Sequence, residues 1–193
     1  MFIQLPSHKH RYIQCKFTPN TNAKTQIALS YYENEQIEEE WYKNGKRHRI
    51  GAPAYIAYYE NKKSEEVWYK NGKRHRIGAP ANISYFDNGQ IAYESWYKDG
   101  ELHKIGTPAI IFYFNNGQIS HESWYVDGKI HHVGAPASVD YFKNGKIAHE
   151  SWYINGDLYR PGSAPAYITY FENDQIQHMA YFKNGKKYTA TVC

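Results

Sequence analysis

The sequence predicts an all-β protein, an elongated and twisted antiparallel β-hairpin repeat array of about six repeats of 27–29 residues. Three observations predict it. One segment recurs along the chain, and most copies start at a Gly-Ala-Pro or Gly-Thr-Pro corner. Aromatic and β-branched residues alternate with polar ones, which is typical of strands. Asn-Gly or Asp-Gly pairs separate the alternating stretches, and self-similarity at this period is the signature of repeat architectures.

A proline and a tryptophan mark two fixed positions of the repeats. Successive prolines are 27, 28, 28 and 29 residues apart, and successive tryptophans are 27, 28, 28 and 28 apart. Because a repeat of this kind contacts only its neighbours, we expect the core to be a thin strip. The prolines are Pro53, Pro80, Pro108, Pro136 and Pro165. The tryptophans are Trp41, Trp68, Trp96, Trp124 and Trp152, with Tyr181 at the next position.

Each repeat is expected to contain three strands and two tight turns. The first strand follows the proline, which can start a strand because no ladder hydrogen bond is needed there. Its alternate positions stay constant, as in Ala81, Ile83 and Tyr85, while the positions between them vary. This pattern indicates a strand with one buried side. The middle strand reaches the Trp-Tyr pair, and the third strand follows the second turn.

The turn sequences favour two-residue type I′ hairpins, in which both central residues have positive φ. At the first turn, Asn-Gly pairs occur at 88–89, 116–117 and 144–145. The second turn carries Asn-Gly or Asp-Gly in every repeat. The glycines of these second turns are Gly45, Gly72, Gly100, Gly128, Gly156 and Gly185.

The number of residues between the first turn and the tryptophan differs among the repeats. Seven residues lead from Asn61 to Trp68, but eight lead from Asn88 to Trp96. One extra residue in a strand moves every later side chain to the opposite face. Because we expect all tryptophans to share one side, we predict β-bulges near 94–95, 122–123 and 150–151, and none in the first two repeats.

The net charge of +4 is carried by residues 1–25, the predicted basic N-terminal arm, because residues 26–193, the predicted single repeat domain, are neutral. Such an arm binds an acidic partner or serves as a solubilising tail, and it is also a candidate to cap the first strand. Cys15 and Cys193 form no metal or disulfide motif, and the N-terminal residues lack an apolar core of the length that a signal peptide needs. These features predict an intracellular, reducing, cytoplasmic location.

Two sets of residues are candidates for binding. The tryptophans and Tyr181 form a predicted aromatic interaction surface, because Trp and Tyr anchor protein interfaces and no helix is predicted to cover the sheet. The second set is a predicted basic stripe, which either binds an anionic partner or is neutralised by neighbouring glutamates. The residues of this stripe are Lys46, Arg47, Arg49, Lys73, Arg74 and Arg76.

The sequence does not predict an enzyme. Glu94, Glu122 and Glu150 recur at one position. Acid–base catalysis by two carboxylates needs two different environments, whereas repeated residues share one. Histidines recur as well, but without the cysteines or carboxylates that complete a zinc site. We therefore predict no catalytic residue, metal, cofactor or small-molecule substrate.

The run Trp-Tyr-Lys-Asn-Gly-Lys-Arg-His at 41–48, repeated at 68–75, resembles the MORN repeat (membrane occupation and recognition nexus). Segments 31–34 and 85–90 resemble the MORN-like variant of bacterial antitoxins and large DNA viruses, which has two Asn-Gly hairpins per repeat. The resemblance covers about residues 26–187, although the repeat here is longer and adds a Gly-Ala-Pro corner. It implies a β-solenoid and roles in scaffolding, dimerisation and, in some members, membrane attachment.

These features favour a non-enzymatic structural or scaffold protein that mediates protein–protein interaction or assembly. The resemblance adds the expectation of a viral particle component located in the virion. Two alternatives stay open. One is a module that binds nucleic acid, another polyanion or an anionic membrane surface, and the other, from the resemblance, is an antitoxin-like inhibitor of a partner protein. The unpaired edge strands also offer a route to a homo-oligomer.

Overall fold

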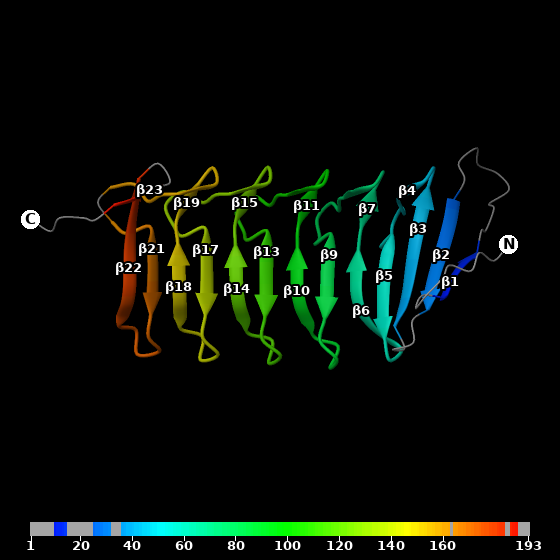
Figure 1. Cartoon of the computed structure of the whole chain (residues 1–193), viewed down its shortest axis with the longest axis horizontal. Coiled ribbons are helices and arrows are strands. Elements are labelled where there is room, and N and C mark those ends of the chain that lie inside the picture. The colour runs from blue at the N-terminus through cyan, green and yellow to red at the C-terminus, as the bar shows by residue number, and fades with distance from the viewer. Residues whose placement is uncertain (1–9, 15–24, 32–35, 163, 184–185, 189–193) are drawn as a thin grey trace, which may run out of the picture. The chain divides into compact units, whose positions relative to one another are not determined.

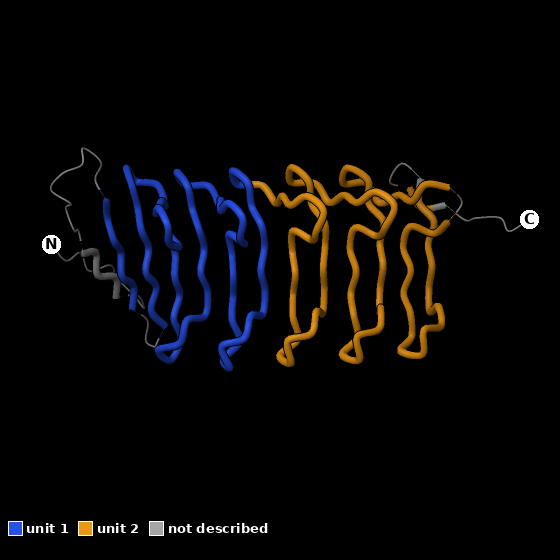
Figure 2. Tube along the Cα trace, turned by 180° about the vertical axis from the view of Figure 1, so that it is seen from behind, with its two compact units in different colours: residues 1–100 blue, residues 101–193 orange. Residues whose placement is uncertain are grey.

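The chain is all-β and is built from antiparallel hairpins, as the repeats predict (Figure 1). The computed structural model describes residues 10–14, 25–31, 36–162, 164–183 and 186–188. The chain divides into two compact units, unit 1 (residues 1–100) and unit 2 (residues 101–193), which are coloured separately in Figure 2. The main sheet has the strand order β1-β2-β3-β5-β6-β9-β10 in unit 1 and β13-β14-β17-β18-β21-β22-β23 in unit 2.

From β5 to β20, pairs of longer strands alternate with pairs of two-residue strands. In unit 1 the strands are β1 (His10–Gln14), β2 (Thr25–Tyr31), β3 (Ile37–Lys43), β4 (Lys46–Arg47), β5 (Tyr55–Tyr59), β6 (Lys62–Val67), β7 (Tyr69–Lys70), β8 (Lys73–Arg74), β9 (Asn82–Tyr85), β10 (Ile91–Ser95) and β11 (Tyr97–Lys98). In unit 2 they are β12 (Glu101–Leu102), β13 (Ile110–Tyr113), β14 (Ile119–Ser123), β15 (Tyr125–Val126), β16 (Lys129–Ile130), β17 (Ser138–Tyr141), β18 (Ile147–Ser151), β19 (Tyr153–Ile154), β20 (Asp157–Leu158), β21 (Tyr167–Tyr170), β22 (Ile176–Lys183) and β23 (Lys186–Tyr188).

Each inner repeat contains four strands instead of the predicted three, because the middle strand breaks at its tryptophan. Trp68 separates β6 from β7, and the short hairpin β7–β8 forms a sheet of its own. The backbone N–H of Trp68 still donates to the carbonyl of Ala81 (2.7 Å), and the backbone N–H of Ala81 donates to the carbonyl of Ser95 (2.8 Å). The alanine after each proline therefore extends the ladder beyond the strand ends.

The short second hairpins follow one another at one end of the long strands, and the first turns lie at the other end, as Figure 1 shows for each unit. Backbone hydrogen bonds join each second hairpin to the one before it. In unit 1, Gly72 N–H donates to Arg47 C=O (2.8 Å) and Gly100 N–H to Arg74 C=O (2.9 Å). In unit 2, Gly128 N–H donates to Leu102 C=O and Gly156 N–H to Ile130 C=O (both 2.9 Å).

The predicted type I′ geometry is confirmed at the second turns. Asn44 (φ 51°) and Gly45 (φ 74°) both have positive φ, as this turn requires. The four following second turns have the same signs, at 71–72, 99–100, 127–128 and 155–156. The turn at 184–185 lies outside the described residues.

At the first turns the type I′ prediction is wrong. Asn88 is not among the described residues with positive φ, whereas Gly89 has φ 82°. Phe86 N–H donates to the carbonyl of Gln90 (2.8 Å), so a three-residue loop with glycine in the left-handed region closes the hairpin. In contrast, Glu60 and Asn61 form a two-residue turn with φ 49° and 60°. The extra residue of the later repeats is therefore accommodated in the turn.

The predicted bulges occur, but at other positions. The register shifts leave Ala92, Ser120 and Ala148 unpaired, two to three residues before the predicted sites. A bulge at Ser64 contradicts the prediction of a regular second repeat, while β2 and β3 pair without a shift, as predicted. Since repeats of both turn lengths have the bulge, it does not compensate for the extra residue.

The core is a thin strip of small and β-branched residues. The five alanines that follow the prolines are 0% exposed, and Ile83, Ile111 and Val139 on the same strands are buried, which confirms the predicted inner side. Several residues between these positions are buried too, including Asn82 and Ser138. The fully buried alanines are Ala54, Ala81, Ala109, Ala137 and Ala166.

The first strand edge is covered by part of the predicted basic arm. Strand β1 pairs antiparallel with β2 over five residues, from His10 opposite Tyr31 to Gln14 opposite Ile27. Capping of the first repeat by the arm, one of the expectations from sequence, is therefore confirmed for residues 10–14.

Candidate interaction surface

The most regular feature of the surface is a cation placed against the tryptophan of the same repeat. The guanidinium carbon of Arg49 lies 3.7 Å from the ring centre of Trp41, and that of Arg76 lies 3.7 Å from Trp68. In unit 2 the corresponding distance from Arg160 to Trp152 is 3.9 Å. We call these pairs, together with the pair described next, the Trp–cation stacks.

Histidine replaces arginine in one repeat. The imidazole of His132 lies 5.1 Å from the ring of Trp124 at a tilt of 48°. A basic residue stands eight positions after each tryptophan, and it is Arg49, Arg76, Lys104, His132 and Arg160 in turn. This spacing is the sequence signal that the predicted basic stripe missed, because the stripe ended at Arg76. Four of the six rings of the predicted aromatic surface, those of Trp41, Trp68, Trp124 and Trp152, are thus in contact with a basic side chain.

In each unit, carboxylates and tyrosines lie beside the stacks on one face of the main sheet. The register places Glu39, Ile56, Glu66 and Ile83 opposite one another across unit 1, so glutamate alternates with an aliphatic residue. Unit 2 has the same alternation through Glu122, Val139, Glu150 and Ile168. We call this the glutamate face.

Tyrosine hydroxyls donate to these carboxylates. Tyr85 donates to Glu66 (3.1 Å), Tyr141 to Glu122 (2.6 Å) and Tyr170 to Glu150 (2.8 Å). Burial, together with the negative charge of Glu66, raises the pKa of Tyr85 to about 12. Glu66, Glu122 and Glu150 thus accept hydrogen bonds from neutral phenols of neighbouring strands, which is a structural role.

The residues of the predicted basic stripe fall into three environments. Arg49 and Arg76 cover tryptophans, and each also donates to a proline carbonyl. Arg47 and Arg74 point into the side of the sheet opposite the glutamate face. Only Lys46 and Lys73 are exposed, each with its aliphatic stem across the turn glycine of the next repeat. The structure therefore does not bring the six cations together.

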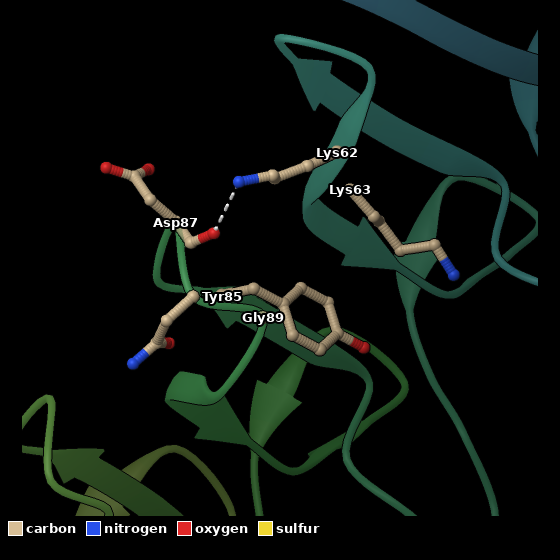
Figure 3. Close-up of a pocket in the computed structure, with 6 residues that line it drawn as sticks. Lys62, Lys63, Tyr85, Asp87 and Gly89 are labelled. Atoms are coloured by element: carbon tan, nitrogen blue, oxygen red, sulfur yellow. Dashed lines mark hydrogen bonds between the residues drawn. The ribbon is translucent and has the colours of Figure 1, made fainter.

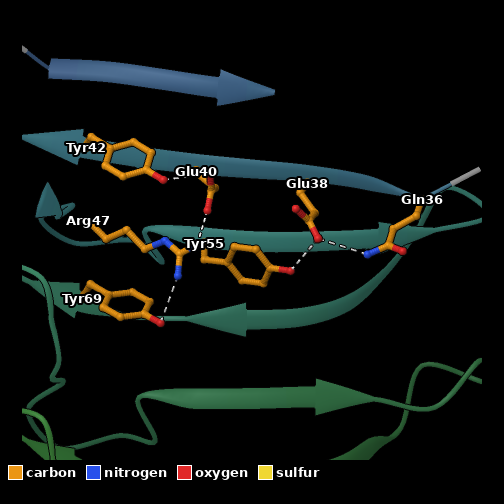
Figure 4. A network of polar contacts seen from close by, with 7 residues as sticks. All are labelled: Gln36, Glu38, Glu40, Tyr42, Arg47, Tyr55 and Tyr69. Atoms are coloured by element: carbon orange, nitrogen blue, oxygen red, sulfur yellow. Dashed lines mark hydrogen bonds and ion pairs between the residues drawn. The ribbon is translucent and has the colours of Figure 1, made fainter. Parts of the chain in front are cut away.

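Arg47 is neutralised by a network of polar contacts (Figure 4). It forms an ion pair with the buried carboxylate of Glu40 and lies 5.4 Å from the rings of both Tyr55 and Tyr69. Desolvation disfavours the guanidinium charge, but the hydrogen bond and charge of Glu40 outweigh it and raise the pKa of Arg47. Tyr42 donates to the second oxygen of Glu40 (2.8 Å). Neutralisation by neighbouring glutamates, one of the two alternatives, therefore applies to Arg47, and also to Arg49, which lies 3.4 Å from a carboxylate oxygen of Glu39.

The histidines that follow the second turns bind each second hairpin to the next one. We call them the histidine column, and they are His48, His75, His103 and His131. The Nδ1 atom of His48 accepts the N–H of Asn71 (3.1 Å), and that of His75 accepts the N–H of Asp99 (3.1 Å). Unit 2 has the same bond from Asp127 to His103 (3.2 Å) and from Asn155 to His131 (3.0 Å). These rings act as acceptors for the backbone of the next turn.

Two histidines of unit 2 form a clamp on an aspartate. His121 and His149 each place Nδ1 2.7 Å from a different carboxylate oxygen of Asp140, on the strand between them. The hydrogen bonds from these two rings hold the pKa of Asp140 well below its ordinary value, although burial opposes them. Within the described part of the chain, no group of three or more His, Cys, Asp or Glu side chains is arranged to hold a metal ion.

A hollow of about 480 Å³ lies between the first turns of two neighbouring repeats of unit 1 (Figure 3). Lys62 lines it and donates to the carbonyl of Asp87 (3.1 Å), and Lys63 forms an ion pair with Glu66. Tyr85 and Gly89 form further parts of the wall. Because both ammonium groups already have anionic or carbonyl partners, this hollow offers no convergent set of groups for chemistry.

Sequence reasoning also missed a row of exposed aliphatic residues. Ile50, Ile77, Ile105 and Val133 are 84%, 87%, 80% and 76% exposed. Each stands nine positions after its tryptophan and directly before the glycine of the corner. Their common spacing and chemistry are visible in the sequence, but strand alternation says nothing about residues in corners.

Comparison with known proteins gives no family. The chain matches no protein-family model, and a search of curated proteins finds no matching relative. In the described residues, no helix has both the length and the apolar composition needed to cross a bilayer. The resemblance to MORN repeats therefore stays a prediction, carried by the motifs at 41–48 and 68–75.

Proposed function

We propose that this chain is a non-enzymatic repeat scaffold that binds another protein through the Trp–cation stacks. The observation that carries the proposal is the recurrence of one side-chain pair, with centre distances of 3.7, 3.7 and 3.9 Å for the three arginine members. Trp, Tyr and Arg are the residues most enriched at binding hot spots. Stacking fixes the arginine side chain before a partner arrives, which lowers the entropic cost of binding.

The glutamate face supports the same proposal. Its carboxylates receive tyrosine hydroxyls, as in Tyr141 with Glu122 and Tyr170 with Glu150, so the polar groups are already oriented. The face repeats with the period of the stacks, and repeat proteins commonly use such periodic surfaces to bind extended partners. Enzymatic chemistry is not part of the proposal, because the repeated carboxylates share one environment.

A comparative capture experiment tests the proposal. The wild-type chain, the stack variant R49Q/R76Q/R160Q and the matched control K62Q/K143Q/K146Q are immobilised, and proteins captured from native lysate are quantified by isotope-labelled mass spectrometry. Both variants lose three cations, but the control cations lie at first turns. We expect at least one protein to be lost from the stack variant and kept by the control.

The captured protein is then purified and titrated calorimetrically. Loss of a hot spot costs about 2 kcal/mol or more, so we expect the stack variant to bind at least about 30-fold more weakly than the control. Equal capture and equal affinity for both variants would contradict the proposal.

A second candidate function is binding of a polyanion by unit 1. The observation that favours it is the set of exposed lysines at the second hairpins, Lys46, Lys70, Lys73 and Lys98. Anisotropy of a labelled single-stranded oligonucleotide, measured over a salt series, tests it. Polyanion binding should weaken steeply with salt, whereas salt-independent or absent binding would remove this candidate.

A further inference from the structure

Unit 1 contains the same run of residues twice. Trp-Tyr-Lys-Asn-Gly-Lys-Arg-His forms residues 41–48 and again 68–75, and in both copies Asn-Gly is the tip of a type I′ second turn. Asn-Gly is the dipeptide most prone to spontaneous deamidation, because glycine has no side chain to hinder its nitrogen as it attacks the asparagine amide. Since the two copies have the same neighbours in sequence, a difference in reactivity between them in the folded chain comes from the structure.

The turn of the second copy is held by the hairpin before it. Gly72 N–H donates to Arg47 C=O (2.8 Å), and Asn71 N–H donates to Nδ1 of His48 (3.1 Å). The aliphatic stem of Lys46 also lies 3.5 Å from where a Cβ of residue 72 would be. The nitrogen that would attack is therefore engaged, and the turn becomes reactive only when these contacts open.

The turn of the first copy lacks these contacts among the described residues. No described second hairpin precedes the one formed by β3 and β4, and Gly45 N–H has no acceptor in the part of the chain that the structure describes. A Cβ at Gly45 would have no heavy atom within 4 Å, and Asn44 is exposed. The backbone pairs of the stem, such as Lys43 with Lys46, close the hairpin but leave its tip uncovered.

The other Asn-Gly pairs of the described chain are engaged as the second copy is. At three first turns the glycine N–H donates to the phenylalanine carbonyl three residues before it (2.8–2.9 Å), and the asparagine Oδ1 accepts the N–H two residues after it (2.9–3.0 Å). Gly156 N–H donates to Ile130 C=O (2.9 Å). The first turns concerned are those at 88–89, 116–117 and 144–145, and the pair at 184–185 lies outside the described residues.

We propose that Asn44 is a site of spontaneous deamidation. The nitrogen of Gly45 attacks Cγ of Asn44, so that a new N–Cγ bond forms, the Cγ–Nδ2 bond breaks, and Nδ2 leaves as ammonia with the former amide proton. Water then opens the cyclic imide. Cleavage of the new N–Cγ bond gives aspartate, and cleavage of the original peptide bond gives isoaspartate, whose main chain runs through Cγ. One water is consumed and one ammonia is released, without any redox step.

The two products differ in their effect on the hairpin. Aspartate fits the turn, since Asp99 and Asp127 occupy the same position with φ 51° and 47°. Isoaspartate adds one carbon to the main chain, so a two-residue turn can no longer join Lys43 to Lys46 with type I′ geometry. Both products add a negative charge beside the two lysines. The reaction therefore changes the charge of this second hairpin and, where isoaspartate forms, its shape.

Peptide mapping of the purified full-length chain, incubated at mildly alkaline pH, tests the proposal. Cleavage after glutamate places Asn44 in peptide 41–60 and Asn71 in peptide 67–94, and fragment-ion mass spectrometry quantifies both conversions. In the folded chain we expect Asn44 to convert at least about fivefold faster than Asn71, because opening its turn breaks neither of the two hydrogen bonds. In urea the two rates should be equal. A folded chain in which Asn44 converts no faster than Asn71, or an unfolded chain in which the two rates differ by the same factor, would overturn the proposal.

The variant H48A tests whether contacts between hairpins protect the second copy. It removes the acceptor of the Asn71 N–H and leaves the first turn unchanged. Conversion at Asn71 should accelerate while that at Asn44 stays constant, and circular dichroism verifies that the variant folds. The matched control is H131A, which removes the acceptor of Asn155 and should leave both rates as they are. Unchanged conversion at Asn71 in H48A, or equal acceleration at Asn44, would show that the preceding hairpin does not protect the turn.

Discussion

At the scale of single residues, the clamp on Asp140 joins three neighbouring strands of unit 2. The carboxylate receives Nδ1 of both His121 and His149 at 2.7 Å, and these hydrogen bonds depress its pKa. A carboxyl whose folded pKa is depressed contributes stability above its unfolded pKa of about 3.9. That contribution is lost as the pH falls from there through the folded pKa. Acid should therefore release the clamp only below about pH 4.

Replacement of Asp140 by asparagine tests this linkage. D140N cannot accept both N–H groups as a carboxylate does, and we expect the free energy of unfolding at pH 7 to fall by about 1 kcal/mol, a value reduced for the partial exposure of the side chain. The difference from wild type should shrink below pH 4. Urea unfolding at pH 7, 4 and 3 measures it, with D157N at an exposed position as the control. A difference that stays constant with pH would contradict the charged clamp.

Gly89 occupies the left-handed position of a first turn. Gly89 has φ 82°, and a Cβ built there would have no heavy atom within 4 Å. Gly89→Ala should thus cost only backbone strain, about 1 kcal/mol of unfolding free energy. Asp174 occupies the equivalent position of the last repeat with φ 66°. Asp174→Gly is the reciprocal control, in which relief of strain and loss of the exposed Lys146 ion pair should offset to within about 0.5 kcal/mol.

At the scale of elements, the histidine column fixes each second hairpin to the next. His103 accepts the N–H of Asp127, and His131 accepts that of Asn155. His103→Ala leaves the Asp127 amide without its acceptor, so we expect exchange of that amide with solvent to accelerate about fivefold or more, as a hydrogen bond of about 1 kcal/mol predicts. The Asn155 amide in the same variant is the internal control. Unchanged exchange at Asp127, or equal acceleration at both amides, would rule out this role.

The elements also show what the sequence can predict. Period-two alternation identified the strands and the buried alanines, and Asp-Gly at 99–100 correctly predicted a type I′ turn. Asn-Gly at 88–89 did not, because an added residue turns the hairpin into a three-residue loop, in which only Gly89 needs positive φ. Local chemistry specifies that a turn exists, whereas loop length and strand pairing together decide its type.

The surface was less predictable than the strands. The tryptophans recur visibly in the sequence, but nothing in alternation shows that the chain after the second hairpin places Arg49 over Trp41. That contact depends on the path of the corner in three dimensions. Conversely, the predicted basic stripe combined residues that are neighbours in sequence. Because successive side chains of a strand point to opposite faces, Lys46 and Arg47 lie in different environments.

At the scale of the whole molecule, we expect the tyrosine–glutamate pairs to make the free energy of unfolding decrease at alkaline pH. Burial, then the neighbouring glutamates, raise the pKa of Tyr85 and Tyr170 to about 12, and Tyr141 is shifted in the same direction. Unfolded tyrosine has a pKa of about 10, so above that pH the folded chain retains more protons than the unfolded chain. Stability should accordingly decrease as the pH rises from about 10 to about 12.

The two pairs of unit 2 are coupled, because the charge of Glu150, the acceptor of Tyr170, also raises the pKa of Tyr141. Y141F removes the ionisable group and also the hydrogen bond to Glu122, so it should lower the unfolding free energy at pH 7 by about 1 kcal/mol and flatten the alkaline decrease. E122Q keeps an acceptor but removes the charge, which should bring the pKa of Tyr141 closer to its ordinary value. Absorbance titration at the phenolate band and urea midpoints from pH 7 to 11.5 measure both effects. A wild-type midpoint that holds constant above pH 10 would show that the phenols ionise without disturbing the sheet, and the glutamate face would then not stabilise the fold through neutral tyrosines.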